Sequence, residues 1–357
     1  MHVLHICETA RGGVGTYIDT LVVLEKATIQ SRVIIPDKHR DMLAPSVDAV
    51  TFPYSGRSVA ALWRMIRVAL RERHAFRPDI VFCHSTFSLL ALAVLRPLLP
   101  RARFIYCAHG WAGEREMASS RKAAAVRWLE GHMARLAHRI VNVSQSDLNH
   151  AQHYGYGGNQ ILIENAVRPA KPSSLDAPFG DDPALIHLLF VGRHDRQKGL
   201  DILLAAFAQV RFSRPDLRLH VIGYSVTDRT PETGPTEGVN FLGWISADSI
   251  DGYYRSADLV VMPSRWEGLP LVIPEALRNG TPVLVSDRSN LPTLIQPGET
   301  GLVFALSTDA LTSALRWLDK TTLRAMRPAC FALFEQRYHA GRLGREMRAL
   351  YRELTAQ

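Results

Sequence analysis

HVLHICETARGGVGTYIDTLVVLEK, residues 2–26, is a short strand-like run, a glycine-rich turn and an apolar segment of helical length in succession. This order is typical of the first unit of a doubly wound parallel sheet, in which a tight turn leads from a buried strand into a helix. Gly12, Gly13 and Gly15 let backbone N–H groups approach an anion, and the start of the helix adds a favourable potential. We therefore expect an acceptor or phosphate loop here, with a plain tight turn as the alternative.

The same loop partly matches a dinucleotide-binding fingerprint. Gly13 and Gly15 have the required spacing, but Ile18 stands where the third glycine should be. Asp37 lies about twenty residues further on, where such a fold places the acidic residue that binds a ribose. An NAD-dependent oxidoreductase therefore stays open on this loop alone.

Strand-like and helix-length segments alternate along the whole chain. The strand-like runs are HVLHIC, RVIIP, AVTFP, DIVFCH, RFIYCAH, RIVNVS and QILIEN, followed by IHLLFVG, LRLHVIG, VNFLG, DLVVMPS, TPVLVSD and TGLVF. Helix-length segments at 15–26, 58–76 and 121–137 separate some of the earlier runs. The alternation breaks over residues 165–184, a stretch with four prolines and little apolar content. This pattern predicts an α/β fold of two Rossmann-like, doubly wound parallel-sheet domains that face each other across a cleft.

The expected domain boundaries follow from that break. The N-terminal domain covers 1–168, a linker covers 169–185, and the C-terminal domain covers 186–340. A final helix covers 341–357, and packing back on the N-terminal domain is one option for it.

Charge is distributed unevenly along the chain. The first 170 residues contain 21 Lys and Arg against 13 Asp and Glu, whereas the remainder has 21 of each. A basic field of this kind attracts nucleic acid, anionic lipid or phosphorylated substrates. No apolar stretch reaches the roughly 20 residues of a membrane span, and the start does not resemble a secretory signal. We therefore expect a cytoplasmic protein.

The cysteines are scattered without the spacing of a zinc site, and they are expected to be reduced core residues. They stand at Cys7, Cys83, Cys107 and Cys330.

Two further loops follow expected strands in the second half. FVGRHDRQKGL, residues 190–200, contains Arg193 and Lys198, two cations that can converge on a diphosphate. SRWEGLPLVIPEALRNGTPV, residues 264–283, contains Glu267 and Glu275 in an otherwise apolar run. A buried carboxylate needs a polar partner, so these two either form local ion pairs, Glu275 with Arg278 for example, or bind a ligand with donor groups.

These two segments, about seventy residues apart, resemble the retaining glycosyltransferases of family 4, which have the GT-B fold. Glu267 and Glu275 match the E-x7-E signature of that family. The resemblance implies that Arg193 and Lys198 hold the diphosphate of a nucleotide sugar and stabilise the leaving charge. It also implies that Glu275 accepts the ribose hydroxyls.

The resemblance extends to the sugar and to the acceptor. It implies that Glu267, with Gly268 and the backbone near Leu269 and Leu271, contacts the donor sugar. Gly13 is a further donor contact, and His109, in YCAHGW, meets the donor sugar across the cleft. Transfer then keeps the anomeric configuration, and the leaving phosphate takes the acceptor's proton. No D-x-D triplet is present, so neither a metal nor a cofactor is expected.

Some positions remain open at this stage. His84 and Ser144 end strand-like runs and either touch the acceptor or serve as core and cap residues. The polar loop from Tyr224 to Gly238 is a candidate contact to the base.

The basic half of the chain includes a segment with Arg64, Arg67 and Arg71 on one helical face. Such a face can lie on anionic lipid, or it can be an ordinary solvated helix surface. Family members that extend lipid-linked glycans dock on membranes through the N-terminal domain, which favours the first interpretation. Nucleic acid is not an expected partner.

The resulting hypothesis is a metal-independent retaining glycosyltransferase at the inner face of the cell membrane. It would transfer a sugar to a lipid-linked glycan of a bacterial surface polysaccharide, such as a lipopolysaccharide or an exopolysaccharide. A sugar-nucleotide epimerase or phosphorylase of the same fold, and a non-catalytic nucleotide-sugar-binding protein, are the alternatives.

Overall fold

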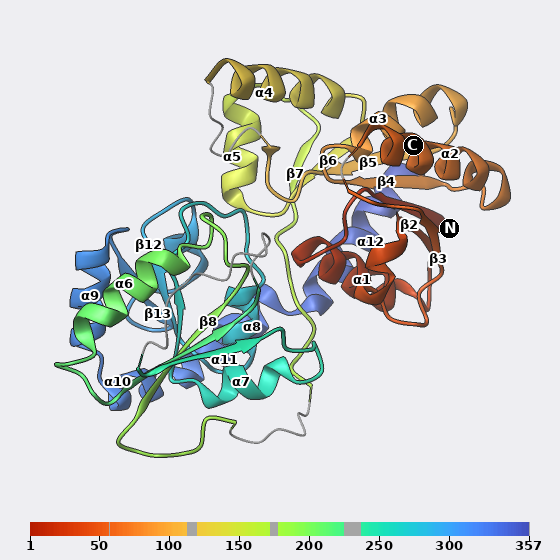
Figure 1. Ribbon diagram of the computed structural model, residues 1–357. Helices are drawn as coiled ribbons and strands as arrows, with labels where there is room; N and C mark the ends of the chain where they lie inside the picture. The colour runs from red at the N-terminus through yellow and green to blue at the C-terminus, as the bar shows by residue number, and fades with distance from the viewer. Residues whose placement is uncertain (57, 113–119, 172–177, 225–236, 357) are drawn as a thin grey trace. The chain divides into compact units, whose positions relative to one another are not determined.

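The computed structural model describes residues 1–56, 58–112, 120–171, 178–224 and 237–356 (Figure 1). The chain divides into two compact units, which are described separately below. Unit 1 comprises residues 1–168 and 340–357, and unit 2 comprises residues 169–339. Most of the polar loop expected near the base, residues 225–236, lies outside the described residues.

Unit 1 is built on a seven-stranded parallel sheet with strand order β3-β2-β1-β4-β5-β6-β7. Its strands are β1 (His2–Cys7), β2 (Gln30–Pro36), β3 (Ala49–Phe52), β4 (Ile80–His84), β5 (Arg103–Cys107), β6 (Arg139–Asn142) and β7 (Gln160–Leu162). Its helices are α1 (Gly13–Glu25), η1 (Asp37–Met42), α2 (Val59–Ala75), α3 (Ser88–Leu95), η2 (Arg96–Leu98), α4 (Ser120–Ala134), α5 (Gln145–His153) and α12 (Ala340–Ala356).

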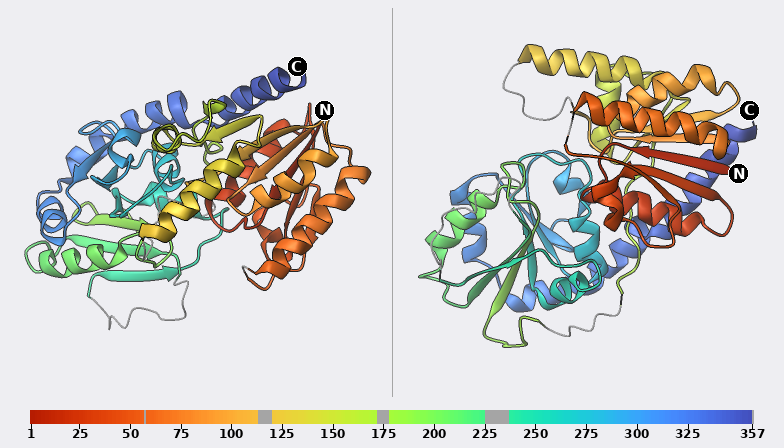
Figure 2. Two further views of the ribbon diagram at one scale, coloured as in Figure 1. Left: turned by 90° about the horizontal axis from the view of Figure 1, so that it is seen from above. Right: turned by 45° about the vertical axis from the view of Figure 1, so that its right-hand side comes forward.

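Helices cover both faces of this sheet (Figure 2). On one face α1 and α12 pack on the strands, and Leu21 and Tyr351 are fully buried there. On the other face α2, α3 and α4 bury Met65, Leu92 and Ala134. Because both faces are covered, the central strands are apolar along their length, as in other parallel sheets.

Unit 2 is built on a six-stranded parallel sheet with strand order β10-β9-β8-β11-β12-β13. Its strands are β8 (Ile186–Val191), β9 (Leu217–Ile222), β10 (Val239–Gly243), β11 (Leu259–Met262), β12 (Val283–Ser286) and β13 (Gly301–Phe304). Its helices are α6 (Leu200–Val210), α7 (Ile250–Ser256), α8 (Val272–Arg278), η4 (Leu291–Leu294), α9 (Thr308–Arg316), α10 (Lys320–Ala325), α11 (Arg327–Leu333) and η5 (Phe334–Tyr338). Buried side chains of α6 and α9 form the core on one face of this sheet.

The predicted α/β fold with two doubly wound parallel sheets is confirmed, and each strand-like run of the sequence overlaps one of the strands β1 to β13. The four cysteines are buried and unbridged, as predicted.

The stretch expected as a linker makes contacts with unit 2 where it is described. The Phe179 ring stacks on His220 at 3.6 Å, and the Phe179 amide donates to Ser256. This segment therefore packs on unit 2. Residues 172–177 lie outside the described part of the chain.

Gly199 allows a close approach between two loops of unit 2. Its φ is +70°, and a Cβ placed on it would lie 2.0 Å from the carbonyl oxygen of Pro263, which follows β11. Only glycine therefore lets the loop after β8 lie against the end of β11.

We expect Gly199→Ala to lower the free energy of unfolding by more than the ~1 kcal/mol that positive φ alone costs a non-glycine residue. Gly298→Ala is the matched control, because Gly298 has φ +83° and open space around its Cβ position. Denaturant unfolding of both variants measures the difference. Equal losses would show that the contact with Pro263 relaxes without cost.

Candidate functional site

The candidate site in unit 2 lies at the carboxyl ends of β8 and β11. The strand order reverses between these neighbours, and ligands bind open parallel sheets at such a point. The loop after β8 supplies Lys198, and the loop after β11 supplies Glu267. The Nζ atom of Lys198 lies 2.6 Å from Oε1 of Glu267, and both side chains are largely buried. Two predicted site residues, 69 positions apart, are thus in direct contact.

Further hydrogen bonds fix Glu267 in this position. Gln197 donates from Nε2 to the backbone oxygen of Trp266 at 3.0 Å and to Oε2 of Glu267 at 3.4 Å. The Glu267 amide donates to Oγ of Ser289 at 3.2 Å. A carboxylate with this many partners is rigid, and a pair of opposite charges away from water is strongly coupled. Gln197 was not identified from the sequence, although it directly precedes Lys198.

Arg193 is placed differently from Lys198. Its guanidinium lies 3.0 Å from the Asp195 carboxylate, and its side chain is half exposed. Gln197 Oε1 also accepts from Arg193 at 3.2 Å. Arg193 is therefore a solvated cation at the mouth of the loop, whereas Lys198 is held inside it.

Glu275 is partly buried on α8, and its contacts extend into α7. The hydroxyl of Tyr254 donates to Oε2 of Glu275 at 2.9 Å. The Arg278 guanidinium lies 2.8 Å from the Asp251 carboxylate. Burial raises the pKa of Glu275, while the positive charge of Arg278 and the Tyr254 hydrogen bond act against that shift. Tyr254 was not identified from the sequence, because it lies 21 residues before its partner.

The segment between the two glutamates presents backbone donors. Leu269 and Leu271 are buried, so their side chains belong to the core. Within the described residues, the amides of Gly268 and Leu271 have no hydrogen-bond acceptor. Leu271 is the N-cap of α8, and Gly268 lies in the loop before it. An amide at the start of a helix has no partner within the helix and can bind a ligand oxygen.

In unit 1 the glycine loop leads from β1 into α1 as predicted. Gly12 has φ +78° and caps the helix without a side-chain hydrogen bond, so Gly13 is the first helical residue. A Cβ on Gly15 would lie 2.1 Å from the carbonyl oxygen of Ala10. Gly15 is therefore required by the tight turn itself, whereas Gly12 and Gly13 are exposed.

His109 is the last member of a hydrogen-bonded chain of three histidines. Nδ1 of His5 lies 3.0 Å from Nε2 of His84, and Nδ1 of His84 lies 3.0 Å from Nε2 of His109. The Tyr17 ring meets His109 edge-on, with 4.7 Å between the ring centroids. His109 has φ +54°, a conformation that a non-glycine residue adopts only when its surroundings enforce it.

The histidine chain has a preferred proton arrangement. Burial lowers the pKa of His5 and of His109 to about 3, and burial with two imidazole neighbours lowers the pKa of His84 well below its ordinary value. All three rings are therefore neutral near pH 7, with one N–H each. Nε2 of His5 is buried without a partner among the described residues, and an unpaired N–H is rarer than an unpaired acceptor. Donation therefore runs from His5 to His84 to His109, and His109 presents Nδ1–H.

Two positions left open by the sequence have structural roles. Oγ of Ser144 accepts from the Asp147 amide at 3.0 Å, so Ser144 is the N-cap of α5. His84 is fully buried within the histidine chain.

The described residues contain no group of three or more His, Cys, Asp or Glu arranged to hold a metal ion.

Known structures share this architecture. Sucrose-phosphate synthase from Thermosynechococcus elongatus superposes over the whole of both chains with a TM-score of 0.87 and 19% identity. The Anabaena HepE structure with UDP and glucose superposes with a TM-score of 0.82 and 16% identity, covering 99% of this chain and all of that one. The fold is thus the GT-B fold of glycosyltransferases.

Sequence matches point to glycosyltransferases in both halves of the chain. The family described as Glycosyltransferase Family 4 matches residues 11–171, and the family described as Glycosyl transferases group 1 matches residues 186–320. Each part of the chain is thus similar to a glycosyltransferase family.

Two relatives illustrate the range of the match. An uncharacterised 41.2 kDa protein in the cps region of Klebsiella pneumoniae is 29% identical over 313 residues, which cover 85% of this chain and 86% of the relative. D-inositol 3-phosphate glycosyltransferase of Pseudarthrobacter chlorophenolicus is 32% identical over 207 residues, 54% of this chain. The match spans about half (48%) of that enzyme's length.

The histidine chain predicts how stability changes with pH. Below ~6.5, the pKa of a free imidazole, the unfolded chain binds protons at these histidines and the folded chain does not. The free energy of unfolding should therefore rise with pH up to about 6.5 and lose this dependence above it. His5→Leu should make the slope between pH 4 and 6 shallower by up to about 1.4 kcal/mol per pH unit, the share of one proton. Phe82→Leu, at a neighbouring buried ring, should change stability but not the slope. Equal slopes for His5→Leu and the unchanged protein would contradict the conclusion that His5 binds a proton only in the unfolded chain.

Proposed function

We propose that this protein transfers a sugar from a nucleotide-sugar donor to a glycan acceptor on a lipid carrier, with retention of the anomeric configuration. The contact between Lys198 and Glu267 is the observation on which the proposal depends most. It places a cation and a carboxylate at the reversal point of the unit 2 sheet, beside the amides of Gly268 and Leu271. A diphosphate sugar needs both kinds of group, because its phosphates require cations and its hydroxyls require acceptors.

Each residue has a defined part in this proposal. Arg193 and Lys198 bind the diphosphate, and Glu275 accepts the ribose hydroxyls. Glu267 contacts the sugar together with the backbone around Gly268. His109, neutral and presenting Nδ1–H, donates to a sugar hydroxyl. The loop of Gly12, Gly13 and Gly15 serves the acceptor or a phosphate.

The chemistry follows from these parts. The bond between the anomeric carbon and the diphosphate oxygen breaks while the acceptor oxygen bonds to the same face of that carbon. The departing phosphate oxygen takes the acceptor's proton. Lys198 and Arg193 neutralise the charge that develops on the diphosphate, a role that a metal ion plays in other enzymes. The reaction we propose therefore requires no metal and no cofactor.

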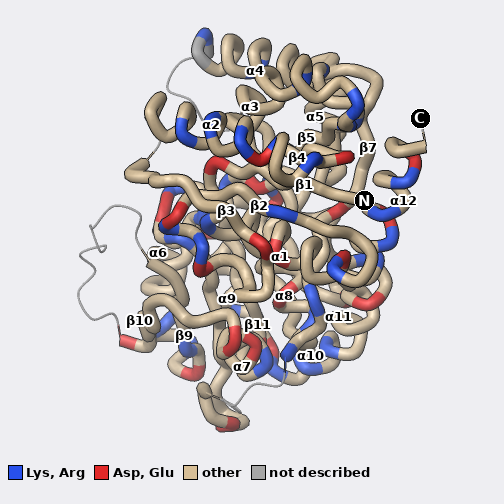
Figure 3. Tube along the Cα trace, turned by 90° about the vertical axis from the view of Figure 1, so that its right-hand side faces the viewer, with Lys and Arg blue, Asp and Glu red and all other residues tan. Residues whose placement is uncertain are grey.

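The lipid-side partner is proposed from the exposed face of α2. Arg64, Arg67 and Arg71 are exposed on this helix, and Trp63 beside them is 61% exposed. Figure 3 shows Lys and Arg at several points along α2. An exposed indole next to cations is typical of a surface that meets a membrane interface. No helix in the described part of the chain is long and apolar enough to cross a membrane. We propose peripheral binding to the inner face of the cell membrane.

The cps-region relative from Klebsiella pneumoniae is consistent with a role in surface polysaccharide synthesis. An epimerase or phosphorylase of the same fold, or a nucleotide-sugar-binding protein without turnover, would use the same cation loop. An epimerase or a phosphorylase would not need the basic face of α2.

Donor binding and turnover test this proposal directly. A thermal-shift panel of UDP, GDP, ADP and CMP should reveal one stabilising nucleotide. The matching nucleotide sugar should then yield a glycoside of the acceptor with retained configuration, and activity should persist in excess EDTA. Conversion of the donor alone to an epimer or a sugar phosphate would favour the alternative enzymes. Full loss of activity in EDTA with rescue by Mg²⁺ would refute metal independence.

The two glutamates should respond differently to removal of their charge. Glu275→Gln should weaken binding of the free nucleotide about tenfold, since a ribose contact is lost. Glu267→Gln should leave nucleotide affinity nearly unchanged and lower kcat by roughly 10²-fold, because its contacts matter while charge develops. Titration calorimetry and initial rates measure both effects.

Asp201→Asn is the control for that comparison, because Asp201 is a carboxylate of the same unit paired with Arg265 at 2.7 Å. Glu267→Gln also removes the partner of Lys198 and should lower the melting temperature. Purely structural roles predict lower melting temperatures with unchanged kcat for both glutamate variants.

The membrane proposal predicts salt-sensitive binding to vesicles. The double variant Arg64→Glu with Arg71→Glu should abolish co-sedimentation with anionic vesicles at low salt, since each cation near the surface contributes about 1 kcal/mol. Arg345→Glu with Arg352→Glu is the matched control, because these two arginines are also seven positions apart and exposed on a helix of unit 1. Equal binding of the unchanged protein to neutral and anionic vesicles would support an ordinary solvated surface.

A further inference from the structure

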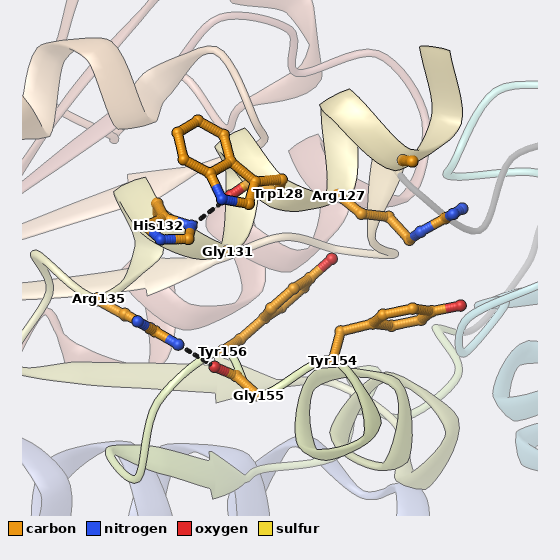
Figure 4. Close-up of a pocket in the computed structure, with 9 residues that line it drawn as sticks. Arg127, Trp128, Gly131, His132, Arg135, Tyr154, Gly155 and Tyr156 are labelled. Atoms are coloured by element: carbon orange, nitrogen blue, oxygen red, sulfur yellow. Dashed lines mark hydrogen bonds between the residues drawn. The ribbon is translucent and has the colours of Figure 1, made fainter. Parts of the chain in front are cut away.

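A pocket of about 260 Å³ lies on unit 1 between α4 and the turn that joins α5 to β7. Figure 4 shows the Tyr156 ring projecting toward α4 between Arg135 and Arg127. The pocket is lined by Ala124, Arg127, Trp128, Gly131, His132, Arg135, Tyr154, Gly155 and Tyr156. It is separate from the glycine loop and from the face of α2.

The lining combines exposed aromatic rings with two arginines. Trp128 is 63% exposed and Tyr154 is 44% exposed, values that are high for large rings on a folded surface. The Arg127 guanidinium lies 5.0 Å from the centre of the Tyr154 ring. No lining residue is acidic, and among the described residues neither Arg127 nor Arg135 forms an ion pair with a carboxylate.

Hydrogen bonds and ring packing hold the walls of the pocket in place. Arg135 donates to the carbonyl oxygen of Gly155. A Cβ on Gly131 would lie 2.3 Å from the Tyr156 ring, so glycine is required for that ring to pack on α4. Nδ1 of His132 lies 2.9 Å from the Trp128 carbonyl oxygen, and the two rings are 4.3 Å apart. The exposed groups are thus presented by a fixed frame.

A buried carboxylate ties α4 to the strands beneath it. Glu130, 1% exposed, accepts from the Thr86 hydroxyl at 2.7 Å, from the Tyr106 hydroxyl at 3.1 Å and from the Ala112 amide at 3.0 Å. α4 is therefore fixed against the loops that follow β4 and β5.

The pocket is joined to the segment that contains His109. The Tyr156 ring packs on Trp111 with 4.7 Å between centroids, and Trp111 follows His109 by two residues. The indole N–H of Trp111 donates to the Asp147 carbonyl oxygen at 3.0 Å. One layer of side chains therefore separates the pocket from the loop that we assign to the reacting sugars.

The size and chemistry of the pocket restrict its ligand. Its volume is smaller than the ~300–1,000 Å³ of pockets that enclose drug-sized ligands, and it is large enough for a single sugar residue. The exposed rings offer flat apolar surfaces to the C–H face of a pyranose, and two guanidinium groups select an anion.

We propose that this pocket binds an acidic sugar residue of the acceptor glycan, away from the residue that receives the new sugar. The pyranose ring lies on Trp128 or Tyr154, and its carboxylate or phosphate meets Arg127 and Arg135. This inference rests on the proposed function, because it assigns the acceptor to the class of anionic glycans.

Ligand-observed NMR titration of the full chain with trigalacturonate tests the assignment, with maltotriose as the neutral probe and inorganic phosphate as the anion alone. Trigalacturonate should bind saturably and at least fivefold more tightly than either control probe. Trp128→Ala and Arg127→Ala should each weaken its binding by fivefold or more. Trp317→Ala and Arg316→Ala are the matched controls, because they alter an adjacent Arg and Trp, with Trp317 81% exposed, in unit 2. These controls should leave binding unchanged.

Several results would overturn the assignment. Absent binding of trigalacturonate, equal binding of maltotriose, or phosphate binding as tight as that of the trisaccharide would each do so. Equal affinities of the Trp128→Ala and unchanged proteins would also overturn it. Loss of anionic-vesicle binding in Trp128→Ala without any trisaccharide binding would instead assign the pocket to the membrane surface. Nucleotide affinity, measured on the same samples, reports on unit 2, so a failure of the proposed function is recognised separately.

Discussion

Parallel pairing around a central first strand is the constraint on which both units depend. β1 lies between β2 and β4, and β8 lies between β9 and β11, so the strand order reverses beside β1 and beside β8. At such a point, the chain segments that follow the two adjacent strands go to opposite faces of the sheet. They leave space at the carboxyl ends of these strands. In unit 2 this space contains the ion pair between Lys198 and Glu267. The close packing of Gly199 on Pro263 holds the two contributing loops together.

Much of this arrangement could be predicted from the sequence. Strands buried on both faces are continuous apolar runs, and each run that we recognised overlaps a strand of the structure. The loops with Gly15, Lys198 and Glu267 could be recognised because they follow such strands directly. The strand, turn and helix around each loop are encoded by residues that are near one another in the chain, which is the range over which sequence patterns carry information. The roles expected for Lys198 and Glu267 came from the resemblance to family 4 glycosyltransferases.

Partners distant in sequence could not be predicted. Tyr254 meets Glu275 because α7 packs beside α8. His5 of β1, His84 of β4 and His109, two residues after β5, align because these three strands are neighbours in the sheet. The same limit applies to the pocket, whose walls come from α4 and from a turn about twenty residues later. A single serine after a strand is equally ambiguous, and Ser144 proved to be a helix cap.

The position of α12 affects how the chain folds during synthesis. Leu343, Met347 and Leu350 of this helix belong to the same core as α1, yet 171 residues of unit 2 are made between Arg168 and Ala340. At ~5–20 residues per second, the ribosome needs roughly 10–30 s to produce them. The part of α1 that packs on α12 stays uncovered during that interval. Unit 2 can therefore complete its own core before the core of unit 1 is closed.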